Sequence, residues 1–70
     1  MEEAIGEAAG QIGQYLRTYG PVSLRQLQQG TNLSQRLLYM GVGWLTREGT
    51  LRFVQERRVL KLALQEEREA

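Results

Sequence analysis

The first third of the chain repeats its apolar residues at the spacing of a helix. Between about Glu2 and Tyr19 they recur every three or four positions, which places them on one face: Ile5, Ala8, Ala9, Ile12, Leu16 and Tyr19. Gly20 and Pro21 follow directly. Glycine accepts the left-handed backbone that ends a helix and proline cannot continue one, so the pattern predicts a helix over residues 2–19.

A shorter apolar pattern follows an extended link over residues 21–23, which has the capacity to pair as a short strand. Ser23 is a favoured residue for the start of a helix, because its side chain can accept a hydrogen bond from a free backbone N–H. We therefore predict a second helix over residues 24–29. It buries Leu24 and Leu27 and ends at Gly30.

After a three-residue turn, Ser34 is suited to cap a third helix over roughly residues 35–48, which Gly49 closes. Helical geometry divides its side chains between two faces. The inward arc consists of Leu37, Leu38, Gly41, Val42, Trp44 and Leu45. The opposite face consists of Arg36, Tyr39, Met40, Gly43 and Arg47.

From Thr50 onward the apolar period changes to two, which is typical of a strand. Leu51 and Phe53 begin the alternation, and after a turn over residues 55–58 it continues with Leu60, Leu62 and Leu64. The intervening residues of the second strand are Val59, Lys61 and Ala63. This pattern predicts a hairpin with one apolar face against the helices and one basic face in water.

The order of these elements defines the fold class. Two helices joined by a short turn form a helix-turn-helix, and a hairpin beside them forms a wing. We predict an α+β, mostly α, winged helix-turn-helix domain over residues 1–64, in which three helices precede a two-stranded wing. Residues 65–70 are expected to form a flexible or frayed tail. The acidic N-terminus is unlike a secretory signal and no apolar run approaches a membrane span, so we expect a cytoplasmic protein without membrane contact.

The composition argues against catalysis. The chain has no cysteine, histidine or aspartate. It therefore lacks the commonest general base and the commonest ligands of transition metals. We expect neither an enzyme nor a cofactor, metal or small-molecule substrate.

The net charge of +1 hides an uneven distribution. Six of the eight acidic residues lie near the two ends: Glu2, Glu3, Glu7, Glu66, Glu67 and Glu69. Between residues 8 and 65, eight basic residues face two acidic ones, a surplus of six positive charges. Seven of these eight are arginines, whose planar guanidinium suits phosphates and guanine edges. This distribution favours a polyanionic partner.

Three stretches carry a resemblance to a known family: VSLRQL, GTNLSQRLLYMGVGWLTREGTL and RFVQERRVLKLAL. Together they resemble a small prokaryotic winged helix-turn-helix family of unknown function, over about residues 4–64. The resemblance implies the fold. It implies little about activity.

The predicted fold points to double-stranded DNA as a partner, because the second helix of a helix-turn-helix commonly enters the major groove. Gln35, Arg36 and Tyr39 would lie nearest the base edges, with Met40, Gly43 and Arg47 further along. The wing would supply four basic residues to the phosphate backbone: Arg52, Arg57, Arg58 and Lys61. Each feature also has a purely structural explanation. The helix face would be an ordinary solvated surface, and the charges of the wing would keep an exposed strand edge from aggregating.

Two features suggest a protein partner, most simply a second copy of the chain. Gly6, Gly10 and Gly13 form a stripe of small residues on the first helix, where another helix could come close. Leu37 and Trp44 lie at the edge of the apolar arc of the third helix, although a tryptophan there is more often a core residue. A homodimer would also double the DNA contacts across two half-sites. The rival function is a protein-interaction module that uses the same fold without DNA.

Overall fold

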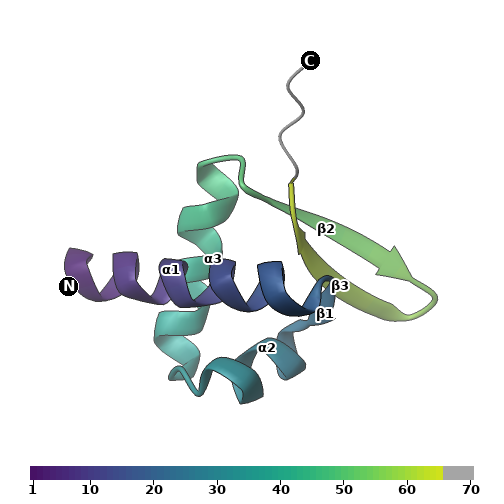
Figure 1. The fold of residues 1–70 in the computed structure, drawn as a ribbon, viewed down its shortest axis with the longest axis horizontal. Helices are drawn as coiled ribbons and strands as arrows, with labels where there is room; N and C mark the ends of the chain where they lie inside the picture. The colour runs from purple at the N-terminus through teal and green to yellow at the C-terminus, as the bar shows by residue number, and fades with distance from the viewer. Residues whose placement is uncertain (66–70) are drawn as a thin grey trace.

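A computed structural model describes residues 1–65 of the chain, and its elements follow the predicted order (Figure 1). Its three helices and three strands are α1 (Glu2–Tyr19), β1 (Val22–Ser23), α2 (Leu24–Thr31), α3 (Gln35–Arg47), β2 (Leu51–Glu56) and β3 (Val59–Leu64). The predicted boundaries of α1 and α3 agree with the structure to within one residue. The proposed tail at 66–70 lies outside the described residues. No helix within residues 1–65 is both long enough and apolar enough to span a membrane.

The helix ends are set by the local signals that the sequence contains. Gly20 has φ 80° and donates its N–H to the Leu16 carbonyl, 2.8 Å away, which closes α1. The Ser23 hydroxyl accepts from the Gln26 N–H at 3.2 Å, and the Gln26 side chain accepts from the Ser23 N–H at 3.0 Å. This reciprocal pair is a capping box, which satisfies two backbone donors at the start of α2. Gly49, with φ 75°, follows α3.

The core forms where all the elements meet. Its buried members come from every helix and strand: Ile12, Leu16, Val22, Leu27, Leu38, Leu51 and Leu62. Figure 1 shows α1 crossing α3 at a steep angle. At this crossing Gly41 of α3 lies directly against α1, because a Cβ on Gly41 would lie 3.3 Å from the Ala9 nitrogen. Small residues on both helices therefore let the two backbones come close.

The prediction that α2 ends at Gly30 is wrong. The helix continues to Thr31, and Asn32 takes the left-handed conformation (φ 60°) that ends it. Gly30 serves packing instead, because the ring of Tyr15 occupies the space that a Cβ at this position would need. A glycine at this position suggested a local helix end. It is needed instead because the side chain of Tyr15, from α1, packs against α2 there.

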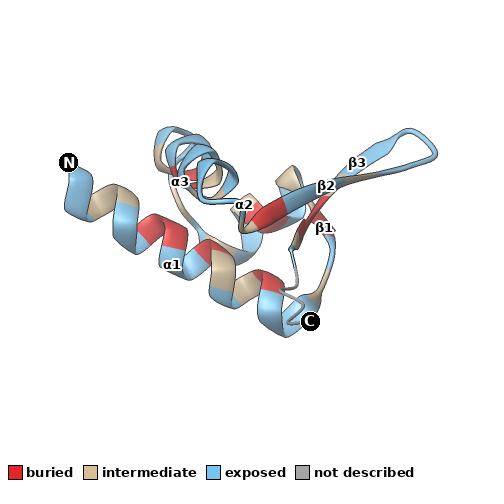
Figure 2. Ribbon diagram, turned by 90° about the horizontal axis from the view of Figure 1, so that it is seen from above, coloured by how far each residue is buried: buried red, intermediate tan, exposed pale blue. Residues whose placement is uncertain are grey.

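The sheet joins a third strand to the predicted two-stranded hairpin, as the extended link over residues 21–23 allowed. Its order is β1-β3-β2, and all neighbours are antiparallel. The short link before α2 forms β1, where Val22 pairs with Leu62 and Ser23 with Lys61. Beyond this short pairing, β2 and β3 continue alone as the wing, which projects from the body of the domain (Figure 2).

Several predicted burial assignments are wrong. Phe53 and Leu60 share a face with the buried Leu51 and Leu62, but both are exposed. Phe53 pairs with Leu62 yet belongs to the edge strand β2, and Leu60 lies beyond the pairing of β3 with β1. Conversely, Ala63 was expected to face water and is buried, because β3 contacts the last part of the core beside α1. Tyr19, expected in the core, is also exposed at the end of α1.

Candidate nucleic-acid interface

The outward face of α3 presents the predicted side chains to solvent. The Ser34 hydroxyl accepts from the Leu37 N–H at 3.2 Å and starts the helix. From there on, the residues of the predicted DNA-binding face are all exposed: Gln35, Arg36, Tyr39, Met40, Gly43 and Arg47. Eleven residues separate Arg36 from Arg47, which is about three helical turns or 16 Å. Gln35–Arg47 contains no acidic residue, so nothing on the helix itself neutralises the two guanidiniums.

One contact orders the N-terminal half of this face. The Gln35 side-chain amide donates to the Tyr39 hydroxyl at 3.3 Å, one helical turn further on. Both side chains remain exposed. The pair therefore presents an amide and a phenol side by side at the end of α3 that a helix-turn-helix directs toward base edges.

The wing places most of its predicted basic residues in solvent. Arg52, Arg57 and Arg58 are exposed, whereas Lys61 is half-buried and its ammonium lies 3.1 Å from a carboxylate oxygen of Glu56. The predicted basic outer face is thus partly neutralised at Lys61. The strands extend to Glu56 and from Val59, so the turn consists of the two arginines alone rather than of residues 55–58.

Arg57 has an unusual backbone conformation. Its φ of 55° lies in the left-handed region, where two-residue hairpin turns normally carry glycine or asparagine. A non-glycine residue held in a sparsely populated region costs on the order of 1 kcal/mol. The turn therefore gives up some stability to place an arginine at its tip.

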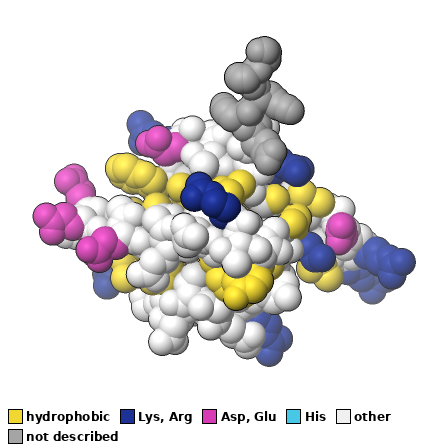
Figure 3. Space-filling model, viewed as in Figure 1, with side chains coloured by type: hydrophobic (Ala, Val, Ile, Leu, Met, Phe, Trp, Pro, Cys, Tyr) yellow, Lys and Arg dark blue, Asp and Glu magenta, His cyan; other side chains and the backbone are white. Residues whose placement is uncertain are grey.

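The relative positions of these elements can be followed in Figure 2. Here α3 and the wing lie on one side of the molecule and α1 runs along the other. The basic residues are not confined to that side, since Arg17 belongs to α1 and Arg25 to α2, and both are exposed. Figure 3 accordingly shows basic side chains at several places around the outline. The acidic side chains gather mainly at the N-terminal end of α1 in the same view.

The predicted dimer residues lie in two different settings. At Gly6, Gly10 and Gly13 a Cβ would meet nothing within 4 Å, so this chain does not use the stripe for its own packing. Leu37 is half-buried. Trp44, placed on the inward arc by the sequence, is 46% exposed.

The exposure of Trp44 follows from the way the helices cross. It lies at the edge of the arc, and α1 crosses α3 at a steep angle instead of running along it (Figure 1), so α1 does not cover the whole length of that edge.

The comparison with known families gives a clear assignment. The profile of a family described as winged helix-turn-helix domain, DUF2582, matches residues 1–64. The chain belongs to this family. The match confirms both the resemblance seen in the sequence and the predicted fold class.

A solved structure has the same fold as this family member. The solution NMR structure of protein BT2368 from Bacteroides thetaiotaomicron superposes with a TM-score of 0.79 at 25% sequence identity, over 91% of this chain and 79% of the other. No protein with a curated function matches the chain. These comparisons establish the winged helix-turn-helix architecture.

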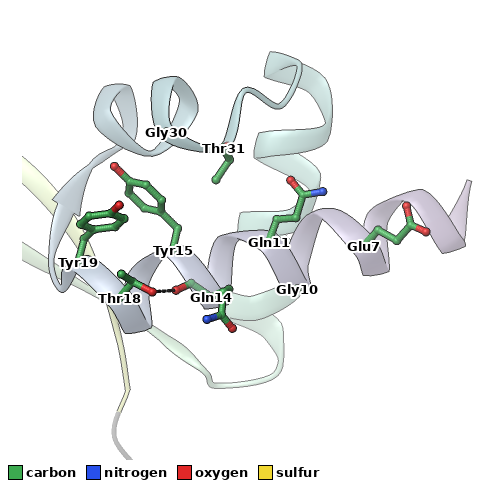
Figure 4. Close-up of a pocket in the computed structure, with 9 residues that line it drawn as sticks. All are labelled: Glu7, Gly10, Gln11, Gln14, Tyr15, Thr18, Tyr19, Gly30 and Thr31. Atoms are coloured by element: carbon green, nitrogen blue, oxygen red, sulfur yellow. Dashed lines mark hydrogen bonds between the residues drawn. The ribbon is translucent and has the colours of Figure 1, made fainter.

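Sequence reasoning missed a groove between α1 and α2 (Figure 4). It has a volume of about 610 Å³, and its lining includes Tyr15, Tyr19 and Gly30. The two tyrosine rings lie 4.5 Å apart, centre to centre, with their planes tilted by 40°. Its polar rim comprises Gln11, Gln14, Thr18 and Thr31, and the hydroxyls of both threonines donate to carbonyls of their own helices. The one-turn spacing of Tyr15 and Tyr19 is the one feature of the sequence that indicates this groove.

Glu7 is the one charged side chain that lines the groove. Within residues 1–65, no three histidine, cysteine, aspartate or glutamate side chains come together in a way that could hold a metal ion.

Proposed function

We propose that this winged helix-turn-helix domain binds double-stranded DNA as a homodimer, with α3 in the major groove and the wing on the phosphate backbone. This activity fits a small transcription-regulatory or chromosome-associated protein. The observation that carries the proposal is the outward face of α3, where Arg36 and Arg47 are exposed without an acidic residue between them. A B-DNA major groove about 12 Å wide admits such a helix.

The side chains along α3 have distinct roles in this proposal. Arg36 can donate two hydrogen bonds to a guanine edge, and Gln35 can pair in the same two-point manner with adenine. Gly43 adds no side chain between the helix and the groove, which permits a close approach. Arg47, at the far end of the helix, would contact a phosphate.

The wing tip supports the same proposal. Arg57 and Arg58 follow each other in the two-residue turn, so the two positive charges project from the end of the hairpin. The strained backbone of Arg57 is an energetic cost that an ordinary turn residue would avoid. A contact between the Arg57 side chain and the DNA backbone would offset this cost.

Fluorescence anisotropy with a random duplex at about 50 and about 200 mM salt tests the proposal, because each neutralised phosphate adds roughly −0.9 to the slope of log affinity against log salt. Arg36→Ala and Arg58→Ala should each make the slope shallower by about one. Arg17→Ala is the matched control, since it removes the same charge from α1. Equal effects of all three variants would show that binding does not use this face. Absence of binding at low salt would refute the proposal.

A protein-interaction function is the second candidate, and a specific observation favours it. Tyr39 and Met40 are exposed next to each other on α3, and exposed aromatic and methionine side chains are frequent in protein interfaces. Titration of a labelled chain with a short duplex, followed by chemical-shift mapping, separates the two functions. Shifts confined to α3 and the wing support DNA, whereas an unchanged spectrum supports a protein partner.

A further inference from the structure

The wing contains an ion pair between its two strands. Val54 pairs with Lys61 and Glu56 with Val59, so Glu56 and Lys61 are diagonal neighbours on the same face. The Lys61 ammonium lies 3.1 Å from a carboxylate oxygen of Glu56. Glu56 is the one acidic residue between residues 51 and 64, a segment that carries four basic ones. The pair therefore neutralises one of the four positive charges of the wing.

The pair lies in a hollow near the wing tip. The hollow has a volume of about 570 Å³, and it is lined by Glu56, Arg57, Val59 and Lys61. Two of these four side chains are cationic, and both ammonium and guanidinium groups bind phosphate oxygens through charge-assisted hydrogen bonds. The carboxylate of Glu56 opposes such binding, because an anion that reached the Lys61 ammonium would also lie close to a negative charge.

Lys61 has little freedom to leave this position. Its side chain is 31% exposed, whereas that of Glu56 is 58% exposed. The stem of a fully exposed lysine is flexible, which lets its ammonium reach different partners. Because most of the Lys61 side chain is covered, its ammonium stays beside the carboxylate. A DNA phosphate would have to enter the hollow to contact it.

The pair also divides the charge of the wing into two parts. Arg57 and Arg58 form the tip, and Arg52 lies nearer the base, about 17 Å from Arg57 along the strand. Between them the Glu56–Lys61 pair carries no net charge. The wing thus presents exposed guanidiniums at both ends of an uncharged middle.

The stability of the wing depends little on this pair. More than half of the Glu56 side chain is in contact with water, and ion pairs at such positions are weakened by solvent and salt. Phosphate binding is more sensitive to a single charge, because each neutralised phosphate releases counterions from the DNA. The main consequence of the pair is therefore its effect on how the wing binds phosphates.

We propose that Glu56 is a positioning residue that keeps Lys61 from binding DNA phosphates, so that the wing contacts the DNA backbone through its arginines alone. The inference rests on the DNA binding of the proposed function. It removes Lys61 from the phosphate contacts that the sequence predicts. Without the carboxylate, the hollow would become an additional phosphate site formed by Lys61 and Arg57.

Glu56→Gln tests the inference, because it keeps the size of the side chain and removes its charge. In fluorescence anisotropy with the random duplex, the slope of log affinity against log salt should become steeper by about 0.9, the contribution of one additional phosphate. The gain in affinity should therefore be about 3.5 times larger at about 50 mM salt than at about 200 mM salt. Glu7→Gln is the matched control, since it removes the same charge from α1, on the other side of the molecule from the wing (Figure 2). It should leave the slope unchanged.

Lys61→Ala identifies the side chain through which Glu56 acts. In the original chain it should change the slope far less than Arg58→Ala, which removes a contact at the tip. In the Glu56→Gln chain it should remove the additional contact and return the slope to its original value, so the effects of the two substitutions should not be additive. Arg58→Ala should make the slope shallower by about one in both chains.

The outcomes distinguish this inference from the proposed function. An unchanged slope for Glu56→Gln, or an equal steepening by Glu7→Gln, would overturn the inference while leaving DNA binding intact. The same holds if Lys61→Ala in the original chain makes the slope shallower by as much as Arg58→Ala does, because Lys61 would then contact a phosphate despite Glu56. Absence of DNA binding at low salt would overturn both.

Discussion

Two glycines of α3 provide a sharp test of how α1 and α3 cross. Gly41 and Gly43 lie on the same helix, two residues apart, and each would gain the same methyl group on substitution by alanine. A Cβ on Gly41 would lie 2.7 Å from Cδ1 of Ile12, 3.3 Å from the Ala9 nitrogen and 3.4 Å from the Ala8 carbonyl carbon. A Cβ on Gly43 would meet nothing within 4 Å.

The magnitudes follow from two opposing effects. Alanine is favoured over glycine inside a helix by about 0.5–1 kcal/mol, and this gain applies equally to both positions. At Gly41 it is opposed by overpacking, which typically costs about 1–3 kcal/mol. Ile12 is fully buried, so its side chain has no free space to move into, and the Ala9 contact involves backbone. The difference between the two variants therefore isolates the packing cost.

We expect Gly43→Ala to stabilise the domain and Gly41→Ala to destabilise it, with a difference of about 1–3 kcal/mol between their free energies of unfolding. For a domain of this size each kcal/mol shifts Tm by about 4–8 °C. Urea and thermal unfolding followed by far-UV circular dichroism measure both quantities. If Gly41→Ala raises Tm as much as Gly43→Ala does, the close approach of the two helices is wrong.

A double substitution checks the assigned cause. Ile12→Val removes the Cδ1 atom that lies nearest to the added Cβ, and alone it should cost about 0.5–1.5 kcal/mol. Combined with Gly41→Ala, it should cost less than the sum of the two single variants, because the methyl group then occupies vacated space. Strict additivity would place the destabilisation elsewhere, for example in the backbone contact with Ala9.

Three further predictions concern the turns and the first helix. Gly30→Ala should force the Tyr15 ring to shift and should cost less than Gly41→Ala, because Tyr15 is half-buried beside an open groove whereas Ile12 is fully buried, and Tyr15→Ala in the same chain should remove this cost in urea unfolding. Arg57→Gly should raise the free energy of unfolding by about 0.5–1 kcal/mol, because φ is positive at this position. The same substitution should weaken DNA binding in the anisotropy measurement. Unchanged DNA affinity would mean that the wing tip does not contact DNA. Replacing all three glycines of the α1 stripe by alanine should raise Tm, since each lies in open space within a helix; a lower Tm would indicate that something outside the chain already fills that space.

The sequence predicts the elements well because their ends depend on local chemistry. The Gly20–Pro21 stop, the two serine caps and Gly49 each act within a few residues of the backbone they terminate, and each is found in that role. The buried leucines follow from the helical period for a similar reason. A periodic pattern states which side of an element is apolar, and that side usually faces the core.

The errors arise where burial depends on what lies opposite. Phe53 has the correct alternation and pairs with the fully buried Leu62, but alternation cannot show that β2 is the edge strand of the sheet. A glycine is typical of a helix end, but Gly30 is required by its contact with the ring of Tyr15 from α1. Trp44 lies on the edge of an apolar arc, and only the crossing angle of α1 decides whether that edge is covered. The two-residue strand β1 is too short to produce any pattern of its own.

The proposed function has two parts, DNA binding and the homodimer, and both involve α3. Arg36 and Arg47 lie within about 20° of each other around the helix, on the face turned away from α1, whereas Trp44, one of the residues predicted for the dimer interface, lies on the flank beside the crossing. If both parts hold, Arg36→Ala should weaken DNA binding and leave the dimer unchanged. Trp44→Gln should yield monomers that keep the salt dependence of each bound domain, because no charge has been removed, but that lose the gain from two linked half-sites. Arg47→Ala should weaken DNA binding as Arg36→Ala does and leave the dimer unchanged, and an effect on the dimer alone would move this residue from the nucleic-acid face to the protein interface.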